Sequence, residues 1–472
     1  MNQEIISNVV ILDAGSEGKA VARIGNMVVF VPFVVPGDVV DLQIIRKKRS
    51  FIEGKAVRII KYSDKRTEPF CEHFGNCGGC RWQNMSYESQ LYYKQKHVQD
   101  NLIRIGKIPE PEILGIIPSE KTQYYRNKLE FTFSNRRWLT NDEMNDDPGD
   151  REMNALGFHL PLMFDRVLDI NNCYLQSHPS NAIRLEVKKY AIEHHLSFYD
   201  VRKRTGFLRN LLIRTSNTGD LMVILVVDTD DQENILAILD HLNEKFPEIT
   251  SLFYTVNGKN NDTITDLPFS LYKGKPYISE TMTDFCSSGT LKFRIGPASF
   301  FQTNSGQAVK LYRIAAEFGG FRGDETVYDL YSGTGTIAAY ISSAVKKVIG
   351  IESVPAAVED ATNNSRRNRI TNTRFFAGEA EKVLTPDFVD QNGKPELVIT
   401  DPPRAGMHEK VIRILLELLP GTIVYVSCNP ATQARDIALM NDKYTLVKCQ
   451  PVDMFPQTQH VENVALLASR PG

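Results

Sequence analysis

Residues 327–340 read VYDLYSGTGTIAAY, and the rest of the chain can be interpreted outward from them. The segment starts as an apolar, β-type run, passes through Asp329 and a glycine-rich turn, and continues into residues typical of a helix. Gly333 and Gly335 would let the backbone come close to a ligand. A dinucleotide-binding fingerprint needs a further glycine, but Ala338 stands at that position. The segment therefore predicts a strand, a tight turn and a helix around a ligand that is not a dinucleotide.

Strand-like and helix-like segments alternate on both sides of this turn, from residue 291 to residue 472. Such alternation is typical of a parallel, doubly wound sheet, so we expect an α/β, Rossmann-like domain over these residues. The strand after the glycine turn ends in Glu352, and a carboxylate at that place can accept hydrogen bonds from both hydroxyls of a ribose. The turn and Glu352 together favour a ligand that contains a nucleoside.

A later strand of this domain ends in Asp401-Pro402-Pro403-Arg404. With the glycine turn and Glu352, this motif resembles the S-adenosylmethionine-dependent methyltransferases, many of which place such a motif beside the methyl donor. Two chemistries remain open. Amino-group methyltransferases use an Asp-Pro-Pro loop to hold an exocyclic amine, whereas methylation of a pyrimidine carbon needs a nucleophile and a base.

Cys428 stands where the apolar run TIVYVS ends, and Asn429-Pro430 break the strand at once. Ligands bind at the carboxyl ends of strands in open α/β sheets, so we expect this thiol to face the ligand. Carbon 5 of uracil is a weak nucleophile, but a thiolate that adds to C6 turns the ring into an enolate, and a base must later remove the C5 proton. A free thiol has a pKa of about 8.5, so a positive charge such as Arg404 is needed to favour the thiolate.

The segments SCNP and DMFPQTQHVEN, with FFQTN, DLYSGTG and TDPPRAG, closely resemble the bacterial RNA 5-methyluridine methyltransferases, in particular the members that act on 23S rRNA. The resemblance runs along most of the chain. It implies Cys428 as the nucleophile and Glu462 as the base. It also implies a set of contacts to S-adenosylmethionine, in which Gly333 of the glycine turn is joined by Gln302, Tyr331, Glu352 and Asp401.

The segment CEHFGNCGGC brings Cys71, Cys77 and Cys80 close together, and three such thiols could bind zinc or an iron–sulfur cluster. A zinc ribbon usually needs a second Cys-x-x-Cys pair, which the chain lacks. Among the remaining cysteines, Cys173 is the best candidate for a fourth thiol. The resemblance implies a 4Fe–4S cluster on these four cysteines.

Residues 1–62 contain short β-type runs separated by glycine and proline, which predicts a small β-barrel. Residues 46–66 hold nine Lys and Arg against two Asp and Glu, so they form either a solvated edge strand or a groove for a phosphate backbone. The segments GKAVARI and VPGDVV resemble the TRAM domain, a small RNA-binding barrel. We therefore expect three domains: the barrel over 1–62, a central α+β domain with the cysteine cluster over 63–290, and the methyltransferase domain over 291–472.

The composition limits the partners and the location of the protein. The chain of 472 residues has a formal net charge of −2, so a polyanion must be recognised through local charge. It has neither an apolar run of about 18 residues that could cross a membrane nor a secretory signal, so no membrane partner is expected. Seven cysteines, three of them clustered, favour a reducing cytoplasm over a disulfide framework. We expect a monomer.

Together these features predict S-adenosylmethionine-dependent methylation of C5 of a uridine in 23S rRNA, through a covalent bond from Cys428 to C6. The target base would have to leave its stack, because both of its faces must be reached. One alternative is the same chemistry on the T-loop uridine of tRNA. Another is an amino-group nucleic-acid methyltransferase that uses the Asp-Pro-Pro-Arg motif and gives Cys428 no task, and a third is an RNA-binding protein without catalysis.

Overall fold

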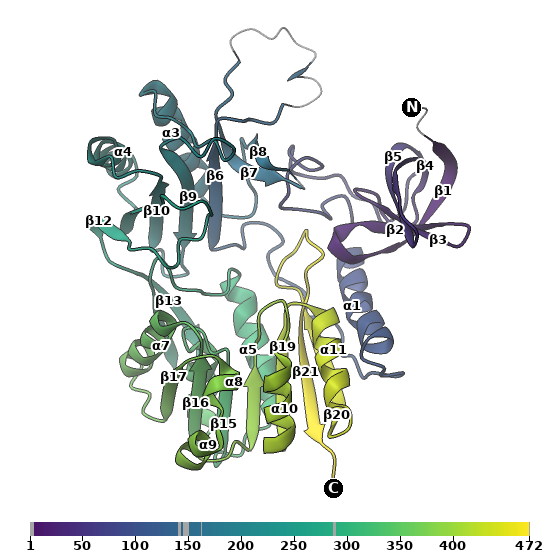
Figure 1. The fold of residues 1–472 in the computed structure, drawn as a ribbon, viewed down its shortest axis with the longest axis vertical. Coiled ribbons are helices and arrows are strands. Elements are labelled where there is room, and N and C mark those ends of the chain that lie inside the picture. Colours follow the sequence, from purple (N-terminus) through teal and green to yellow (C-terminus); the bar gives the residue numbers. More distant parts are fainter. Residues whose placement is uncertain (1–3, 140–142, 145–150, 162, 287–288, 472) are drawn as a thin grey trace.

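The computed structural model describes residues 4–139, 143–144, 151–161, 163–286 and 289–471. A barrel, a central sheet and a second large sheet follow one another along the chain (Figure 1). In the described residues no helix is both long and apolar enough to cross a membrane.

The N-terminal barrel closes from five strands in the order β1-β2-β3-β5-β4. Its strands are β1 (Ile5–Ala14), β2 (Ala20–Ile24), β3 (Met27–Val31), β4 (Val39–Lys47) and β5 (Phe51–Lys61), with a short 3-10 turn, η1 (Ser16–Gly18), after β1. Alternate apolar side chains fill the interior, among them Ile11, Val29 and Val40. The fully buried Asp38 ties the barrel to the chain that leaves it, because its carboxylate accepts hydrogen bonds from the Ser63 amide and the Arg66 guanidinium. The predicted barrel is confirmed.

A long helix then leads from the cysteine segment to the C-terminal sheet. Helix α1 (Tyr87–Arg104) matches the expected apolar periodicity, and the side chain of Ser86 caps its N-terminus. Val98 and Leu102 are fully buried in a core that also contains residues of the C-terminal sheet. Helix α1 therefore packs on the methyltransferase-like part of the molecule although it precedes the central sheet in the chain.

The central sheet has seven strands in the order β12-β11-β10-β9-β6-β7-β8. They are β6 (Lys128–Ser134), β7 (Ala155–Leu160), β8 (Met163–Asp169), β9 (Leu208–Thr215), β10 (Leu221–Val227), β11 (Ser251–Val256) and β12 (Ser270–Gly274), and α3 (Ser180–Glu193) and α4 (Gln232–Lys245) cover one face. Strand β10 is buried along its whole length, as its unbroken apolar sequence predicts. Val223 and Leu225 face the helices, whereas Met222 and Ile224 enter the core that the central sheet shares with the next domain.

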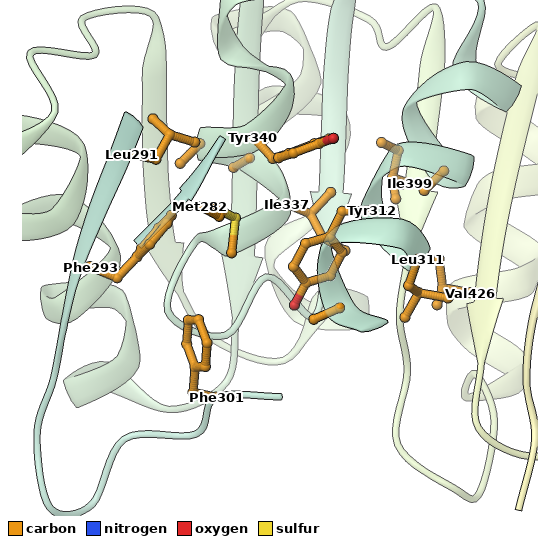
Figure 2. Packing of buried hydrophobic residues seen from close by; sticks show 14 of the residues in the cluster. Met282, Leu291, Phe293, Phe301, Leu311, Tyr312, Ile337, Tyr340, Ile399 and Val426 are labelled. Atoms are coloured by element: carbon orange, nitrogen blue, oxygen red, sulfur yellow. The ribbon is translucent and has the colours of Figure 1, made fainter. Parts of the chain in front are cut away.

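A hairpin of β13 (Ile278–Thr283) and β14 (Thr290–Ile295) connects the two sheets. Met282, Leu291 and Phe293 of this hairpin pack toward α5 (Ser305–Gly319) and the C-terminal sheet (Figure 2). Figure 2 also shows Leu311 of α5 beside Val426 of the C-terminal sheet. This shared core fixes the central sheet and the C-terminal sheet against each other.

The C-terminal sheet has the order β17-β16-β15-β18-β19-β21-β20, and β21 is the one strand that runs antiparallel to both of its neighbours. Its strands are β15 (Thr326–Leu330), β16 (Lys347–Glu352), β17 (Thr373–Ala377), β18 (Leu397–Thr400), β19 (Thr422–Ser427), β20 (Tyr444–Val452) and β21 (Glu462–Ser469). The helices are α6 (Thr336–Ile341), α7 (Pro355–Arg367), α8 (Ala380–Val383), α9 (Pro386–Asn392), α10 (Glu409–Leu418) and α11 (Pro430–Met440), with a 3-10 turn, η2 (Ser342–Ala344). The predicted Rossmann-like α/β sheet is confirmed.

Candidate active site

Polar groups without partners collect at the carboxyl ends of β15 and β18. Both carboxylate oxygens of Asp329, the hydroxyl of Ser332 and the hydroxyl of Thr400 are buried and have no hydrogen-bond partner among the described residues. Buried polar groups are normally paired, so such a concentration indicates a missing ligand. Burial, and then the nearby Asp401, raise the pKa of Asp329 to about 8. These atoms lie where open α/β sheets bind their ligands.

The glycine-rich turn has the backbone that a close ligand requires. Tyr331, Gly333 and Gly335 all have positive φ angles, of 64°, 53° and 73°. A Cβ atom at Gly333 would point into open space, whereas one at Gly335 would lie 2.8 Å from Ala361 and Phe375. Gly335 is therefore needed for packing of the turn against α7 and β17, and Gly333 leaves an open side on the turn.

Glu352, at the end of β16, is fixed by the same turn. Its Oε2 accepts a hydrogen bond from the Gly333 amide at 3.0 Å, and its Oε1 accepts one from the Val354 amide at 2.9 Å. The side chain is half-buried, so free lone pairs can still meet a ligand. A carboxylate held in this way is suited to bind the hydroxyls of a ribose, as predicted from the sequence.

The loop that contains Gln302 lies against this turn and against the central sheet. The hydroxyl of Thr334 donates to the carbonyl oxygen of Phe300 at 3.5 Å. The side chain of Asn127 donates to the Gln302 carbonyl at 2.9 Å and to the Ser305 hydroxyl at 2.8 Å. Asn127 thus holds the Gln302 loop in position.

Cys428 and Glu462 are cross-strand neighbours. Ser427, the last residue of β19, pairs with Asn463 of β21 in an antiparallel register, so Cys428, which follows Ser427, and Glu462, which precedes Asn463, lie at the same end of the two strands. Cys428 is half-buried and Glu462 is 5% exposed. Directly opposed residues have Cβ atoms about 4.5–5.5 Å apart, which brings a thiol and a carboxyl group to one end of the sheet.

The electrostatics of this pair are dominated by burial and by acids. Burial and then Asp401 raise the pKa of Glu462 to about 8, and Arg404 opposes them. Burial, followed by Glu462 and Asp401, raises the pKa of Cys428 to about 11, and Arg404 again opposes the shift. Burial alone raises the pKa of Asp401 to about 7. The site therefore holds protons on its acids at neutral pH, and Arg404 is the group that favours the thiolate.

Sequence reasoning missed Tyr312 of α5. This side chain is 4% exposed, and burial followed by Asp401, Asp329 and Glu462 raises its pKa. A tyrosine on the apolar face of a helix looks like an ordinary core residue, so no local signal could have found it. His460 lies 3.5 Å from the Arg404 guanidinium, and burial lowers its pKa to about 4. It therefore stays neutral beside Arg404.

Cys428 opens into a cavity of about 690 Å³. Its walls come from three regions: Gly18 and Phe33 of the barrel, Gly79 and Trp82 of the cysteine segment, and Cys428 and His460 of the C-terminal domain. The barrel therefore forms part of the walls of this cavity. The indole of Trp82 donates to the Gly18 carbonyl at 3.3 Å, which joins the barrel to this wall.

The four predicted cluster cysteines line a second, smaller cavity of about 150 Å³. Cys71, Cys77, Cys80 and Cys173 all contribute, and burial raises the pKa of Cys77 to about 12 and that of Cys80 to about 11. Within the described residues, no group of three or more His, Cys, Asp or Glu side chains is arranged to hold a metal ion. The nitrogen Nε2 of His73 accepts a hydrogen bond from the Asn171 amide at 2.9 Å, which leaves it no role as a ligand in this arrangement.

Comparison with known proteins agrees with this geometry. Residues 271–470 match the family described as tRNA (Uracil-5-)-methyltransferase, and residues 6–57 match the TRAM domain. An uncharacterized RNA methyltransferase of Bacteroides thetaiotaomicron is 55% identical over 96% of this chain and 100% of its own length. One from Porphyromonas gingivalis is 52% identical over 97% of this chain and 98% of its own length.

The chain belongs to the RNA (uracil-5-)-methyltransferase family. It is an S-adenosylmethionine-dependent enzyme with an N-terminal TRAM domain. Among solved structures, the Pyrococcus abyssi tRNA (uracil-54, C5)-methyltransferase in complex with S-adenosyl-L-homocysteine has 27% identity and a TM-score of 0.73, over 98% of this chain and 100% of that chain. The unpaired carboxylate of Asp329 and the open glycine turn are thus found in a chain that is similar to a solved methyltransferase bound to the demethylated donor.

Proposed function

We propose that this RNA (uracil-5-)-methyltransferase methylates C5 of its target uridine through a covalent bond from Cys428 to C6. The observation that carries the proposal is the register of β19 and β21, which brings Cys428 and Glu462 to the same end of the sheet as the unpaired carboxylate of Asp329. When bound, S-adenosylmethionine supplies an electrophilic methyl group. Gln302, Tyr331, Gly333, Glu352 and Asp401 are the residues proposed to hold it.

The roles of the two reacting side chains follow from their surroundings. The Cys428 thiolate adds to C6, and the electron pair of the C5–C6 double bond moves into the ring to give the enolate. After methylation, the Glu462 carboxylate removes the proton from C5, the C5–C6 double bond re-forms, and the thiolate leaves. Arg404 favours the charged form of both groups, so it assists both the addition of the thiolate and the removal of the C5 proton.

A mechanism-based trap tests the nucleophile and the base together. RNA that contains 5-fluorouridine should form a stable adduct with the wild-type enzyme, because fluorine cannot leave C5 as a proton does. We expect Cys428→Ala to form no adduct and to lose methyl transfer by at least about a thousandfold. With ordinary RNA, Glu462→Gln should accumulate the methylated adduct and turn over about 10²–10⁴-fold more slowly.

Cys286→Ala is the matched control, because Cys286 is an exposed free thiol and the shared cavity is lined by other residues. It should form the adduct as the wild type does. Full activity of Cys428→Ala would refute the covalent route and favour the amino-group chemistry of the Asp-Pro-Pro-Arg motif.

We propose 23S rRNA as the substrate, with a tRNA as the second candidate. The exposed basic strands of the barrel and the cavity that the barrel shares with Cys428 support a large RNA. The Pyrococcus abyssi tRNA enzyme favours the second candidate, and since its alignment covers 98% of this chain, a barrel alone does not separate the two. Transfer of labelled methyl groups to unmodified 23S rRNA and tRNA transcripts in competition decides between them.

We also propose that Cys71, Cys77, Cys80 and Cys173 hold a 4Fe–4S cluster. The support for the cluster is that four thiols line one cavity, which matches the four cysteine ligands of a 4Fe–4S group; the described residues contain no group of side chains already arranged to hold a metal ion. When bound, the cluster would cross-link the cysteine segment to the central sheet. Anaerobically purified protein should contain four iron atoms and show cluster absorption, and Cys173→Ser should lose both while Cys449→Ser keeps them.

The location and assembly state follow from the same residues. We propose a cytoplasmic enzyme, because none of the seven cysteines forms a disulfide, as is usual in a reducing compartment. We propose a monomer, because Cys428, Glu462 and the donor-site residues all come from one chain.

A further inference from the structure

The outer face of the β13–β14 hairpin is polar and basic. Leu291, Phe293 and Ile295 point into the core, so the alternate residues of β14, Lys292 and Arg294, are exposed. Their cross-strand partners on β13 are Thr281 and Ser279, which have short hydroxyl side chains. The face therefore presents two cations and two hydroxyl groups.

Helix α7 is joined to this hairpin by paired amide contacts. The Arg294 amide donates to Asn364 at 2.9 Å, and the Asn364 side chain donates back to the Arg294 carbonyl at 3.4 Å. Asn368 makes the same two contacts with Lys292, both at 2.8 Å. These hydrogen bonds pair the free backbone edge of β14, and they hold the last turn of α7 beside the basic side chains of β14.

Four cations meet at this junction without a carboxylate partner. Lys292, Arg294, Arg366 and Arg367 form no ion pair with any described residue. The Arg294 guanidinium stands 4.0 Å from the centre of the Tyr277 ring. The Nε atom of Arg367 is buried without a hydrogen-bond partner. A cluster of unpaired cations is unusual on a chain with a net charge of −2.

Two cavities, of about 550 Å³ and 490 Å³, flank the Tyr277–Arg294 stack, and both are lined by Arg367. The two acids in their walls are already engaged. Asp360 accepts a hydrogen bond from Ser299, and Asp220 accepts one from the Ser279 amide and pairs with Lys275. The cavities therefore offer donors and positive charge in excess.

We propose that the hairpin and the end of α7 form a second RNA-binding surface, which holds the phosphate backbone of the substrate away from the methylated base. The proposal rests on the RNA substrate of the proposed function. Arg and Lys side chains with neighbouring hydroxyl groups are the usual phosphate contacts of nucleic-acid-binding proteins. The Tyr277–Arg294 stack offers a flat surface to an unpaired base beside that backbone.

The position of this surface gives it a role that the barrel cannot fill. In Figure 1 the hairpin and α7 lie on one side of the C-terminal domain and the barrel lies on the other. Residues 296–304, which include Gln302, connect the basic cavities to α5. An RNA held at both ends would pass over the active site between them, which favours a large folded RNA over a short stem-loop.

The salt dependence of RNA binding tests the proposal. Binding of a labelled 23S rRNA transcript and of a long oligouridylate is measured by filter retention over a series of salt concentrations. The Arg294→Ala/Arg367→Ala variant should lower the slope of log K against log[salt] by about 1.4 on oligouridylate, that is about 0.7 for each lost phosphate contact. Arg366→Glu, a change at an exposed position of α7, should lower it further.

Arg413→Ala is the matched control, because Arg413 is an exposed helical arginine already paired with Glu409. It should keep the wild-type slope, and thermal unfolding should show all variants folded. A wild-type slope in both Arg294→Ala/Arg367→Ala and Arg366→Glu overturns the proposal. Methyl transfer by the wild type is measured on the same transcript. Binding without methyl transfer would reject the proposed function. The salt slopes of the variants would still show whether this surface binds RNA.

Discussion

In the active site, little positive charge stabilises the ionised forms of the acids and the thiol. Asp329, Asp401 and Glu462 have pKa values raised to about 8, 7 and 8, and the pKa of Cys428 is raised to about 11. Each of these groups is more stable in its protonated form, although the proposed chemistry needs Cys428 and Glu462 charged. Arg404 is the residue that pushes both toward the charged form, so its removal should appear in the pH dependence of the reaction.

We expect kcat/KM of the wild type to rise with pH through about 8, where Glu462 loses its proton, and to keep rising toward about 11, where Cys428 becomes a thiolate. Arg404→Gln should raise the pKa values of both groups, so activity at neutral pH should fall about tenfold for each pKa unit. The deficit should shrink as the pH rises above the new pKa of Glu462. A pH–rate profile at saturating methyl donor measures this, with Arg413→Gln as the control. A loss of activity that stays constant with pH would assign Arg404 a purely structural role.

The residues of the site could be found from sequence, but their mutual positions could not. The SCNP and HVEN segments identified Cys428 and Glu462 because a thiol and an acid in those settings resemble a known chemistry. Nothing local predicts that positions 428 and 462 lie at the same end of the sheet, since this depends on the register of β19 and β21. Tyr312 reaches the acids from α5, an element whose sequence is that of an ordinary amphipathic helix.

Among the elements, helix α1 has the closest link to the catalytic loop. Lys94 of α1 and Asp453, before Glu462, form an ion pair of 2.6 Å in which both side chains are fully buried. The Lys94 ammonium also donates to the Phe455 carbonyl at 3.0 Å. Gln90, one turn earlier, makes two hydrogen bonds with Gln457. The backbone amide of Gln457 donates to the side-chain oxygen of Gln90 at 2.9 Å, and the side-chain amide of Gln90 donates to the side-chain oxygen of Gln457 at 3.0 Å. Helix α1 therefore positions the loop that ends in the proposed base.

We predict that Lys94→Met destabilises the protein by about 3–5 kcal/mol, because it leaves Asp453 buried without its counter-charge. Lys96→Met is the control on the same helix. Lys96 is 30% exposed and pairs with Asp13 and Asp100 near the surface, so its loss should cost less than about 1 kcal/mol. Urea unfolding measures both, and equal costs for the two variants would contradict a special role for the buried pair.

The sequence was most informative for elements with strong local patterns. The alternation of strands and helices from β15 to β19 matches expectation, because periodicity is a local property. The insertion of β21 between β19 and β20 and the packing of α1 on the C-terminal sheet were not predicted. Both depend on contacts between residues far apart in the chain, for which a single sequence carries no signal.

At the scale of the whole molecule, the barrel both closes the cavity at Cys428 and carries exposed basic residues. Lys47, Lys48 and Arg49 are exposed at the end of β4 and the turn after it. Lys48 lies 4.9 Å from the ring centre of Phe51, and Tyr62 is 66% exposed. The basic segment is thus available to RNA, while other residues of the barrel line the cavity.

We expect Lys47→Ala/Lys48→Ala/Arg49→Ala to raise KM for RNA and to lower the salt slope of binding by about 0.7 for each phosphate contact, with kcat unchanged at saturation. The reason is that these side chains lie outside the cavity and touch neither reacting group. Steady-state methylation of a 23S rRNA transcript at several salt concentrations measures this. A lower kcat with the wild-type KM would mean that the segment shapes the cavity instead.

The central place of β21 has a consequence for the enzyme during its own synthesis. Strand β21 is the last in the chain, yet it lies between β19 and β20. In a nascent polypeptide Cys428 therefore emerges before Glu462, and the two proposed reacting groups come together only after the last strand has entered the sheet between β19 and β20. Until that final step the proposed nucleophile lacks the proposed base that would release it from a pyrimidine, so a complete reaction cycle must wait for closure of the sheet.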